Sequence, residues 1–184
     1  MERALSSGAV AVAEGMDDFD ALVELYRPRV FRFILASLRN WETAENLTQD
    51  CFVRAYKARD GFRGAASVST WLMHIAANLV RDHASSGRLK FWRKMLRSSI
   101  EPSEVEYSIP DRRMSPEEMA SAKEQIRAIW KATSKLSERQ RTVFLLRFVE
   151  EMELLEIAGV TGLSEGTVKS HLFRALAAIR KEMR

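Results

Sequence analysis

Basic and hydroxyl side chains gather on one side of the last helix that the sequence predicts. The segment at 162–174 reads GLSEGTVKSHLFR, and Ser164 is placed to cap the helix that follows the glycine. From that cap, Val168 and Leu172 point inward, whereas Lys169 and Arg174 point outward near the helix start. Arginine can bond a guanine or a phosphate, and lysine can neutralise a phosphate. A core helix needs only the apolar side, so the sequence favours a helix that lies against DNA.

A helix–turn–helix would position these side chains. A short helix near 154–160 and a turn at Gly162 precede the capped helix. In this motif the first helix braces the second, whose N-terminal residues meet base edges in the major groove. Amphipathicity alone would favour an ordinary surface helix, but the brace, turn and cap in series favour DNA binding. The outward residues are then Lys169, Ser170, Phe173 and Arg174.

The rest of the chain predicts an all-α protein. Its 184 residues are 46% hydrophobic, and they include only eight glycines and four prolines. After a flexible tail at 1–16, apolar stripes predict helices over about 19–38, 43–59 and 69–85. Pro28 lies inside the first stripe and predicts a kink or a join there.

A change of composition divides the chain into two small helical domains. Residues 86–99 carry five basic and no acidic side chains, and residues 100–118 carry six acidic and two basic ones with three of the four prolines. We therefore predict one domain over 17–95, a flexible linker over 96–116 and a second domain over 117–184. The second domain starts with the helix-capping sequence SPEE, and SERQ at 137–140 is a capping box.

Charge and residue usage bound the function. The net charge of +4 permits a polyanionic partner. The lone Cys51 allows no internal disulfide, and no apolar run reaches the length of about 18 residues that a membrane span needs. The three histidines, at 74, 83 and 171, are not spaced with Cys51 as the ligands of a zinc site would be. No phosphate loop or nucleophile motif occurs, so we expect a cytoplasmic protein that is not an enzyme and has no metal or cofactor.

Two blocks of sequence resemble one family. LSERQRTVFLLRFVEEMELLEIAGVTGLSEGTVKSHLFRALAAIRK is similar to region 4 of bacterial RNA polymerase sigma factors of the sigma-70 family. AENLTQDCFVRAYKARDGFRGAASVSTWLMHIAANLVRDH is similar to region 2 of the extracytoplasmic function (ECF, or group IV) sigma factors. The resemblance covers about 17–85 and 117–183. It implies a factor that binds core polymerase and promoter DNA and initiates transcription.

The resemblance implies contacts of region 4 with the −35 promoter element. Arg147 matches a position that touches backbone phosphate. Gly159 and Thr161 depart from the family pattern in the bracing helix, and a glycine there lowers helix stability by about 1 kcal/mol relative to alanine. The expected −35 contacts are Arg147, Thr167, Lys169, Ser170, Phe173 and Arg174.

The resemblance also implies that 62–82 binds and melts the −10 element. An unpaired base needs an aromatic or polar pocket beside a basic helix. Trp71 is expected in the core. The cluster KFWRK at 90–94 extends the DNA track or is a surface helix. The expected −10 contacts are Phe62, Ser69, His74, Asn78 and Arg81.

A polar face of the second helix matches the family's contact with a basic coiled coil on the largest polymerase subunit. An ordinary solvated acidic face is the alternative. The expected polymerase contacts are Glu45, Asn46, Gln49 and Asp50. The resemblance implies two further partners, the polymerase flap and an anti-sigma factor. It leaves two roles open for the acidic linker, which either threads the polymerase channels or is a soluble tether.

Two other functions remain open from the sequence. A LuxR-like helix–turn–helix regulator would bind duplex DNA without polymerase, but it leaves 44–82 unexplained. A helical adaptor or anti-sigma-like binder would have no affinity for DNA.

Overall fold

The computed structural model describes residues 18–85 and 116–183, and every regular element in these ranges is helical. Three predicted segments lie outside the described residues: the tail at 1–16, the basic cluster at 90–94 and the linker up to residue 115. The elements are α2 (Phe19–Leu38), α3 (Trp41–Ala58), the 3-10 turn η1 (Arg59–Gly61), α4 (Val68–Ser85), α6 (Pro116–Ser134), α7 (Glu138–Phe148), α8 (Leu154–Thr161) and α9 (Glu165–Glu182). The all-α prediction is confirmed.

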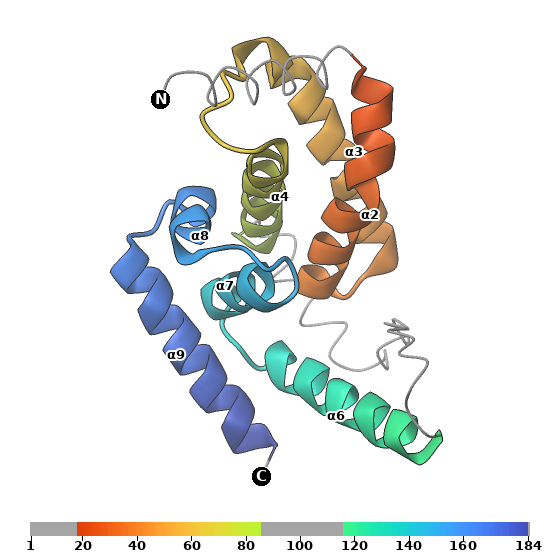
Figure 1. Ribbon diagram of the computed structural model, residues 1–184, viewed down its shortest axis with the longest axis vertical. Helices are drawn as coiled ribbons and strands as arrows, with labels where there is room; N and C mark the ends of the chain where they lie inside the picture. Colours follow the sequence, from red (N-terminus) through yellow and green to blue (C-terminus); the bar gives the residue numbers. More distant parts are fainter. Residues whose placement is uncertain (1–17, 86–115, 184) are drawn as a thin grey trace, which may run out of the picture.

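The helices α2, α3 and α4 pack against one another as an N-terminal bundle (Figure 1). Asp18 caps α2 by accepting a hydrogen bond from the Ala21 amide at 3.0 Å. Pro28 is exposed and lies inside this helix, which continues to Leu38, so the predicted join is wrong. The helix ends where Arg39 adopts a left-handed conformation with φ of 57°. The bundle core is centred on Val30, Phe33, Ile34, Leu72 and Met73.

The second bundle contains α6, α7, α8 and α9, and its local signals act as the sequence predicts. Ser137 and Gln140 form the reciprocal capping box of α7. Gly162 ends α8 with φ of 69°, a conformation that glycine adopts readily because it has no Cβ. Ser164 then caps α9 by accepting from the Thr167 amide at 3.3 Å. The predicted brace, turn and capped helix are confirmed.

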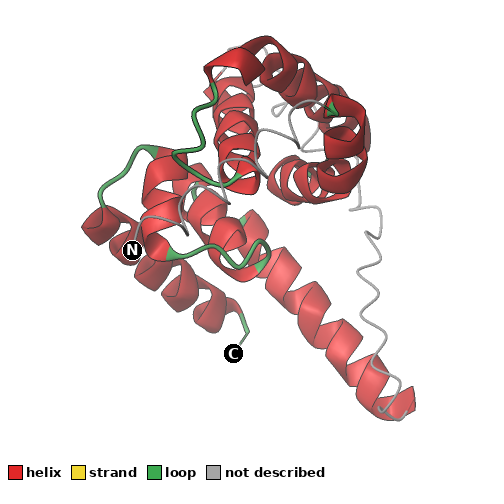
Figure 2. Ribbon diagram, turned by 45° about the horizontal axis from the view of Figure 1, so that its top comes forward, coloured by secondary structure: helices red, strands yellow, loops and turns green. Residues whose placement is uncertain are grey.

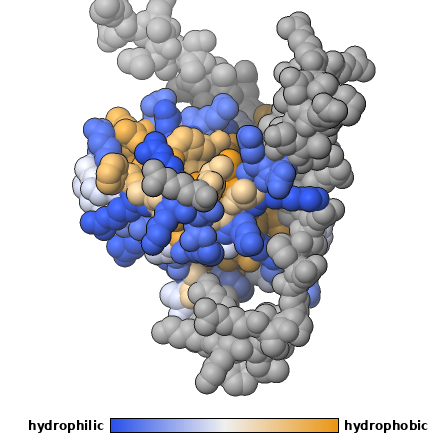
Figure 3. Space-filling view, turned by 90° about the horizontal axis from the view of Figure 1, so that it is seen from below, coloured by the Kyte–Doolittle hydropathy of each residue, from blue (hydrophilic) through white to orange (hydrophobic). Residues whose placement is uncertain are grey.

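The two bundles pack directly on each other. Figures 1 and 2 show α4 beside α8, and the lower part of α2 beside α7. Their buried apolar side chains form one continuous cluster. On the face drawn in Figure 3, hydrophilic residues surround a smaller apolar group. The predicted boundaries of the two domains stay a prediction, and their close packing is a feature that the sequence did not indicate.

Candidate nucleic-acid interface

The inward side of α9 is buried, as its apolar spacing predicts. Val168, Ala175 and Ile179 are buried, and Leu172 and Leu176 are half-buried against the same core. The helix α9 packs on α7, α8 and α6. The contact holds α9 at a defined angle to its bracing helix, which is what a groove-binding helix requires.

The outward side of α9 presents four of the predicted −35 contacts. Lys169, Ser170 and Arg174 are exposed, and Phe173 is 74% exposed. Lys169 pairs with Glu165 one turn earlier, with Nζ and Oε1 2.6 Å apart. An exposed pair of this kind contributes only about 0.3–0.5 kcal/mol, so a phosphate can replace the glutamate. This face therefore carries charge and hydrogen-bonding groups toward solvent.

The other two predicted −35 contacts have partners inside the protein. Thr167 is half-buried, and its hydroxyl lies 2.8 Å from that of Ser164. Arg147 donates to the Met152 carbonyl at 2.9 Å and to the Glu153 carboxylate at 3.3 Å, across the turn that joins α7 to α8. The structure does not bring Thr167 and Arg147 into the exposed face, and their contacts with DNA stay predictions.

One face of α4 carries the polar residues predicted for the −10 element. Arg81 donates to the Asn78 side chain at 2.7 Å, and His74 is exposed one turn earlier. Ser69 is half-buried in the first turn of the helix. The structure brings these residues onto one helix, although Asn78 and Arg81 face the second bundle.

An aromatic pair stands at the start of α4. The rings of Phe62 and Trp71 have centroids 4.9 Å apart and planes inclined at 38°. Both side chains are half-buried, so Trp71 packs against the core as expected but also keeps part of its surface exposed. The exposed part of Trp71 beside Phe62 was not expected, because the position of this tryptophan in the apolar stripe of the helix is that of a core residue.

The second bundle covers part of the −10 face. The Thr70 hydroxyl donates to the Glu156 carboxylate of α8 at 3.1 Å. Asn78 and Arg81 line a cavity of about 60 Å³ with Glu138, Arg139 and other residues of α7 and α8. Glu156 and Glu138 were not expected near the −10 face, since nothing local in the sequence indicates a contact between the two halves.

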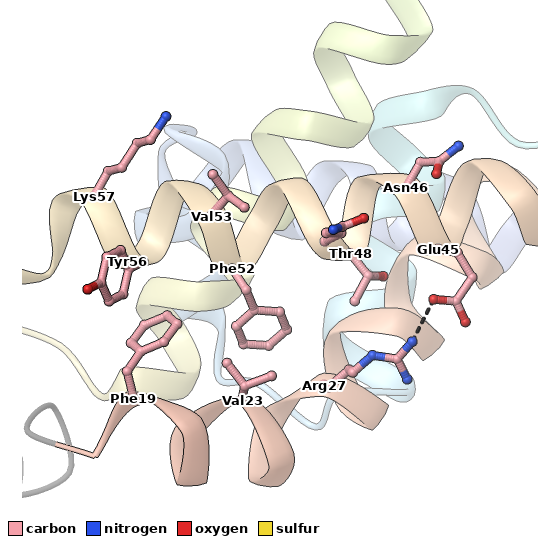
Figure 4. A pocket seen from close by; sticks show the side chains of 11 residues that line it. Phe19, Val23, Arg27, Glu45, Asn46, Thr48, Phe52, Val53, Tyr56 and Lys57 are labelled. Atoms are coloured by element: carbon pink, nitrogen blue, oxygen red, sulfur yellow. Dashed lines mark hydrogen bonds and ion pairs between the residues drawn. The ribbon is translucent and has the colours of Figure 1, made fainter.

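The predicted polymerase face borders a groove between α2 and α3 (Figure 4). The groove has a volume of about 520 Å³, and Phe19 and Val23 of α2 face Phe52 and Tyr56 of α3 across it. At its other end Arg27 pairs with Glu45 at 2.6 Å. Of the predicted contacts, the half-buried Glu45 and the exposed Asn46 and Gln49 line the groove, whereas Asp50 is exposed on α3 outside its lining.

Cys51 is a core residue. It is fully buried, and burial raises the pKa of its thiol to about 12, against a small opposing effect of Arg54. Within residues 18–85 and 116–183, no cluster of histidine, cysteine and acidic side chains could hold a metal ion. None of the described helices is long and apolar enough to cross a membrane.

Both bundles match family models of known protein regions. Residues 22–90 match the family model for Sigma-70 region 2, and residues 126–179 match that for Sigma-70, region 4. The chain is 29% identical over 185 residues to the ECF RNA polymerase sigma factor SigW of Bacillus subtilis, a match that covers all of this chain and 99% of the relative. It is 30% identical to the RNA polymerase sigma-H factor of Pseudomonas aeruginosa over 90% of this chain and 86% of that protein.

Solved structures share the fold. The sigma factor RpoE from Bartonella quintana, solved with the anti-sigma factor NepR, aligns with a TM-score of 0.65 and 23% identity over 90% of this chain and 96% of that one. CnrH, solved with the cytosolic domain of CnrY, aligns with a TM-score of 0.65 and 20% identity over 96% of both chains.

The match to region 2 covers the block at 44–82 that a LuxR-like regulator leaves unexplained. In this chain region 2 precedes region 4, and the similarity to the two curated relatives extends over 99% and 86% of their lengths. The chain therefore belongs to the ECF group of sigma-70 RNA polymerase sigma factors, which initiate transcription and are not themselves enzymes.

Proposed function

We propose that this sigma factor directs core RNA polymerase to promoters through α9 at the −35 element and α4 at the −10 element. The observation that carries the proposal is the exposed face of α9, held by a glycine turn and a serine cap. On it, Arg174 is placed to bond a guanine or a phosphate, and Lys169 to neutralise a phosphate. Ser170 and Phe173 complete the same face, and Arg147 and Thr167 are proposed as further −35 contacts that would have to leave their partners within the protein.

At the −10 element, α4 provides polar groups and an aromatic surface. Asn78 can bond an adenine through both ends of its amide, and Arg81 beside it can hold a phosphate. Phe62 and Trp71 provide a half-exposed pair of rings on which an unpaired base can stack. Ser69 and His74 lie on the same helix as further contacts with the opened strand.

The polymerase contact is proposed for α3 and the adjoining groove. Asn46, Gln49 and Asp50 are exposed, so a basic coiled coil can reach them. Phe19, Phe52 and Tyr56 add an apolar surface next to these polar groups. A polar rim around an apolar centre is typical of protein interfaces. The polymerase flap is the proposed partner of region 4.

We also propose an anti-sigma factor as the regulator, acting in the bacterial cytosol where polymerase and nucleoid lie. The two structures with the same fold, RpoE and CnrH, were solved in complex with the anti-sigma factor NepR and with the cytosolic domain of CnrY, respectively.

The test is run-off transcription with purified core polymerase on a pool of promoters from the source genome. We expect discrete transcripts that disappear when Lys169 and Arg174 are both changed to alanine. Arg180→Ala is the matched control, because it removes an exposed charge from the last turn of the same helix. Transcripts that survive the double change would show that α9 does not bind the promoter.

A second pair of variants tests the polymerase contact. Gln49→Ala with Asp50→Ala is expected to abolish core binding and transcription, and Glu24→Gln removes an exposed acid of α2 as the control. If no transcript forms while the protein alone binds duplex DNA tightly, the sigma function is wrong and the helix–turn–helix regulator takes its place.

A further inference from the structure

The α2–α3 groove keeps apolar side chains open to solvent. Val23 of α2 lines it half-buried, and Val53 and Tyr56 of α3 line it with 45% and 50% of their surface exposed. Phe19 and Phe52 complete the apolar lining, within a volume of about 520 Å³. Because burial of such surface is favourable, the groove is suited to hold a short apolar segment of chain.

The two ends of the groove differ in charge, as Figure 4 shows. Lys57 is exposed beside Tyr56, at the end where α2 begins. At the other end Arg27 and Glu45 lie 2.6 Å apart and balance each other's charge. A segment that fits both features is apolar along the groove and acidic at the Lys57 end.

The sequence that leads into α2 has this composition. Residues 8–13 read GAVAVA and form an uncharged apolar segment, and residues 14–18 read EGMDD and form an acidic segment. In an extended chain alternate side chains point the same way, so Val10 and Val12 would share one side. Their small branched side chains can pack between the larger rings of the groove. The apolar and acidic segments follow each other in the order that the groove requires.

The connection to α2 is long enough for this contact. Phe19 is the first residue of α2 and also lines the groove, so the chain reaches α2 at the Lys57 end. From Phe19 to Arg27 the α2 side of the groove rises about 12 Å, at about 1.5 Å per residue. Six extended residues span about 20 Å, so residues 8–13 can cover that length. Gly15 in the acidic segment can adopt the turn conformations that a reversal of direction needs.

We propose that the apolar segment binds in the α2–α3 groove of its own molecule. Val10 then packs on Val23 and Val12 on Tyr56, while the acidic segment lies beside Lys57. The short connection gives the segment an effective concentration in the millimolar range, so a contact with a dissociation constant of about 0.1 mM keeps about nine-tenths of the groove filled.

A filled groove competes with core polymerase. Asn46 and Gln49 line the groove, and both belong to the polymerase face proposed above. A coiled coil that lies on these side chains has to displace the apolar segment, so the affinity for polymerase falls in proportion to the fraction of molecules whose groove is empty. This consequence rests on the proposed function, whereas the binding of the segment to the groove does not.

Disulfide trapping in the full-length protein tests the binding. Val10→Cys and Val23→Cys are combined in a Cys51→Ala background, and mild oxidation should join the two cysteines within one molecule. A disulfide requires the two Cα atoms to come within about 7 Å of each other. Val10→Cys with Glu24→Cys is the matched pair, because Glu24 is exposed outside the groove lining and closes a loop of almost the same length. It should be trapped about tenfold more slowly, since it needs a molecule whose groove is empty.

The charges give a second check with the same pair of cysteines. Lys57→Glu should slow the trapping of position 10 with position 23 by about two- to fivefold, since an exposed charge contact is weak. Adding Glu14→Lys and Asp17→Lys should restore the original rate. Equal rates for the two cysteine pairs would overturn the proposal. Disulfide-linked dimers in place of the internal bond would also overturn it, because the segment would then fill the groove of a second copy.

Core binding tests the competition. Val12→Asp places a charge in the apolar contact, so it should empty the groove and raise the affinity for core polymerase about tenfold if about nine-tenths of the groove is filled in the original protein. Ser7→Asp is the matched control, since it adds the same charge just outside the apolar segment, and it should leave the affinity unchanged. Both positions precede α2, so neither change removes a contact of the bundle core. Equal affinities of Val12→Asp and the original protein would overturn the competition.

The outcomes separate this proposal from the promoter function, because trapping needs neither polymerase nor DNA. Transcription by the original protein together with equal trapping of the two cysteine pairs would overturn the groove proposal alone. Absence of transcription together with selective trapping of position 10 with position 23 would overturn the promoter function, and with it the competition, while the segment stays assigned to the groove.

Discussion

Phe62 lies against Trp71, with ring centroids 4.9 Å apart, where the loop after α3 leads into α4. Phe62 belongs to the loop and Trp71 to the first turn of the helix, so the pair fixes the loop on the helix. Both rings keep part of their surface exposed. The pair can therefore hold the loop in place and also offer a surface to a base.

Removing the Phe62 ring of this pair should weaken promoter opening. Phe62→Ala is expected to reduce the affinity of the polymerase–sigma complex for a −10 single strand by about 1–3 kcal/mol, the range of base–aromatic stacking. The measurement is strand binding by fluorescence anisotropy, with promoter opening followed by permanganate reactivity of unpaired thymines.

Trp41→Ala is the control for the loss of an aromatic ring. Trp41 is 61% exposed at the opposite end of α3, where it makes an edge contact with Phe31. It should leave strand binding unchanged. Equal losses from Phe62→Ala and Trp41→Ala would show that Phe62 contributes only to the stability of region 2.

The ion pair between Glu165 and Lys169 should modulate DNA binding by α9. Lys169→Ala removes one phosphate contact, so the slope of log K against log salt should fall by about 1. Glu165→Gln should raise the affinity for duplex −35 DNA at low salt, because it removes a negative charge near the phosphates and releases Lys169. Both are measured as salt titrations with a promoter duplex.

Lys181→Ala is the control for a lost positive charge on α9. Lys181 is exposed in the last turn of the helix. If Lys181→Ala changes the salt slope as much as Lys169→Ala does, the positive charges of α9 act without regard to their position. That result would contradict the assignment of the N-terminal part of α9 to the DNA groove.

The sequence predicts the second bundle well because the signals there are local. Ser137 with Gln140, Ser164 and Gly162 each act on backbone groups within a few residues, and all of them are found in the predicted roles. The inward spacing of Val168 also identifies the buried side of α9 correctly. Such features need no knowledge of what packs against the helix.

The contact between the bundles could not be predicted in the same way. Glu150 lies in an acidic stretch, VEEMELLE, in which nothing distinguishes it from its exposed neighbour Glu151. Its partners Arg29 and Arg32 are about 120 positions away in the chain. Which charge becomes buried depends on tertiary packing, and so does the half-buried position of Trp71.

Two glycines in the helix–turn–helix should respond oppositely to the same substitution. Gly159 lies inside α8, and an added Cβ would meet nothing within 4 Å. Gly159→Ala should therefore raise the free energy of unfolding by about 1 kcal/mol, because alanine favours the helix. Gly162→Ala should lower it by about 1–2 kcal/mol, because φ of 69° crowds a Cβ.

Urea denaturation of the two variants and the original protein measures both changes. The pair is its own control, since each change adds one methyl group within three residues of the other. Destabilisation by Gly159→Ala would show that this position requires glycine for a reason other than helix geometry.

The buried thiol of Cys51 should make the stability of the fold fall at high pH. Burial raises the thiol pKa from 9.0 to about 12, so the folded protein holds this proton more tightly than the unfolded chain does. The contribution to stability is therefore complete below pH 9, and it is lost as the pH rises from 9 towards 12. The measurement is the urea midpoint between pH 8 and pH 10.5, compared with Cys51→Ala, in which this part of the pH dependence should be absent.

Alkylation by iodoacetamide checks the same burial independently. The reagent attacks the thiolate, so Cys51 should react slowly in the folded protein at pH 8 and at the rate of a model thiol in urea. Lysine and tyrosine titration also alters stability at high pH, but Cys51→Ala retains those groups and separates their effect. Rapid alkylation of the folded protein at pH 8, or identical pH profiles for both proteins, would contradict a buried neutral thiol at the centre of region 2.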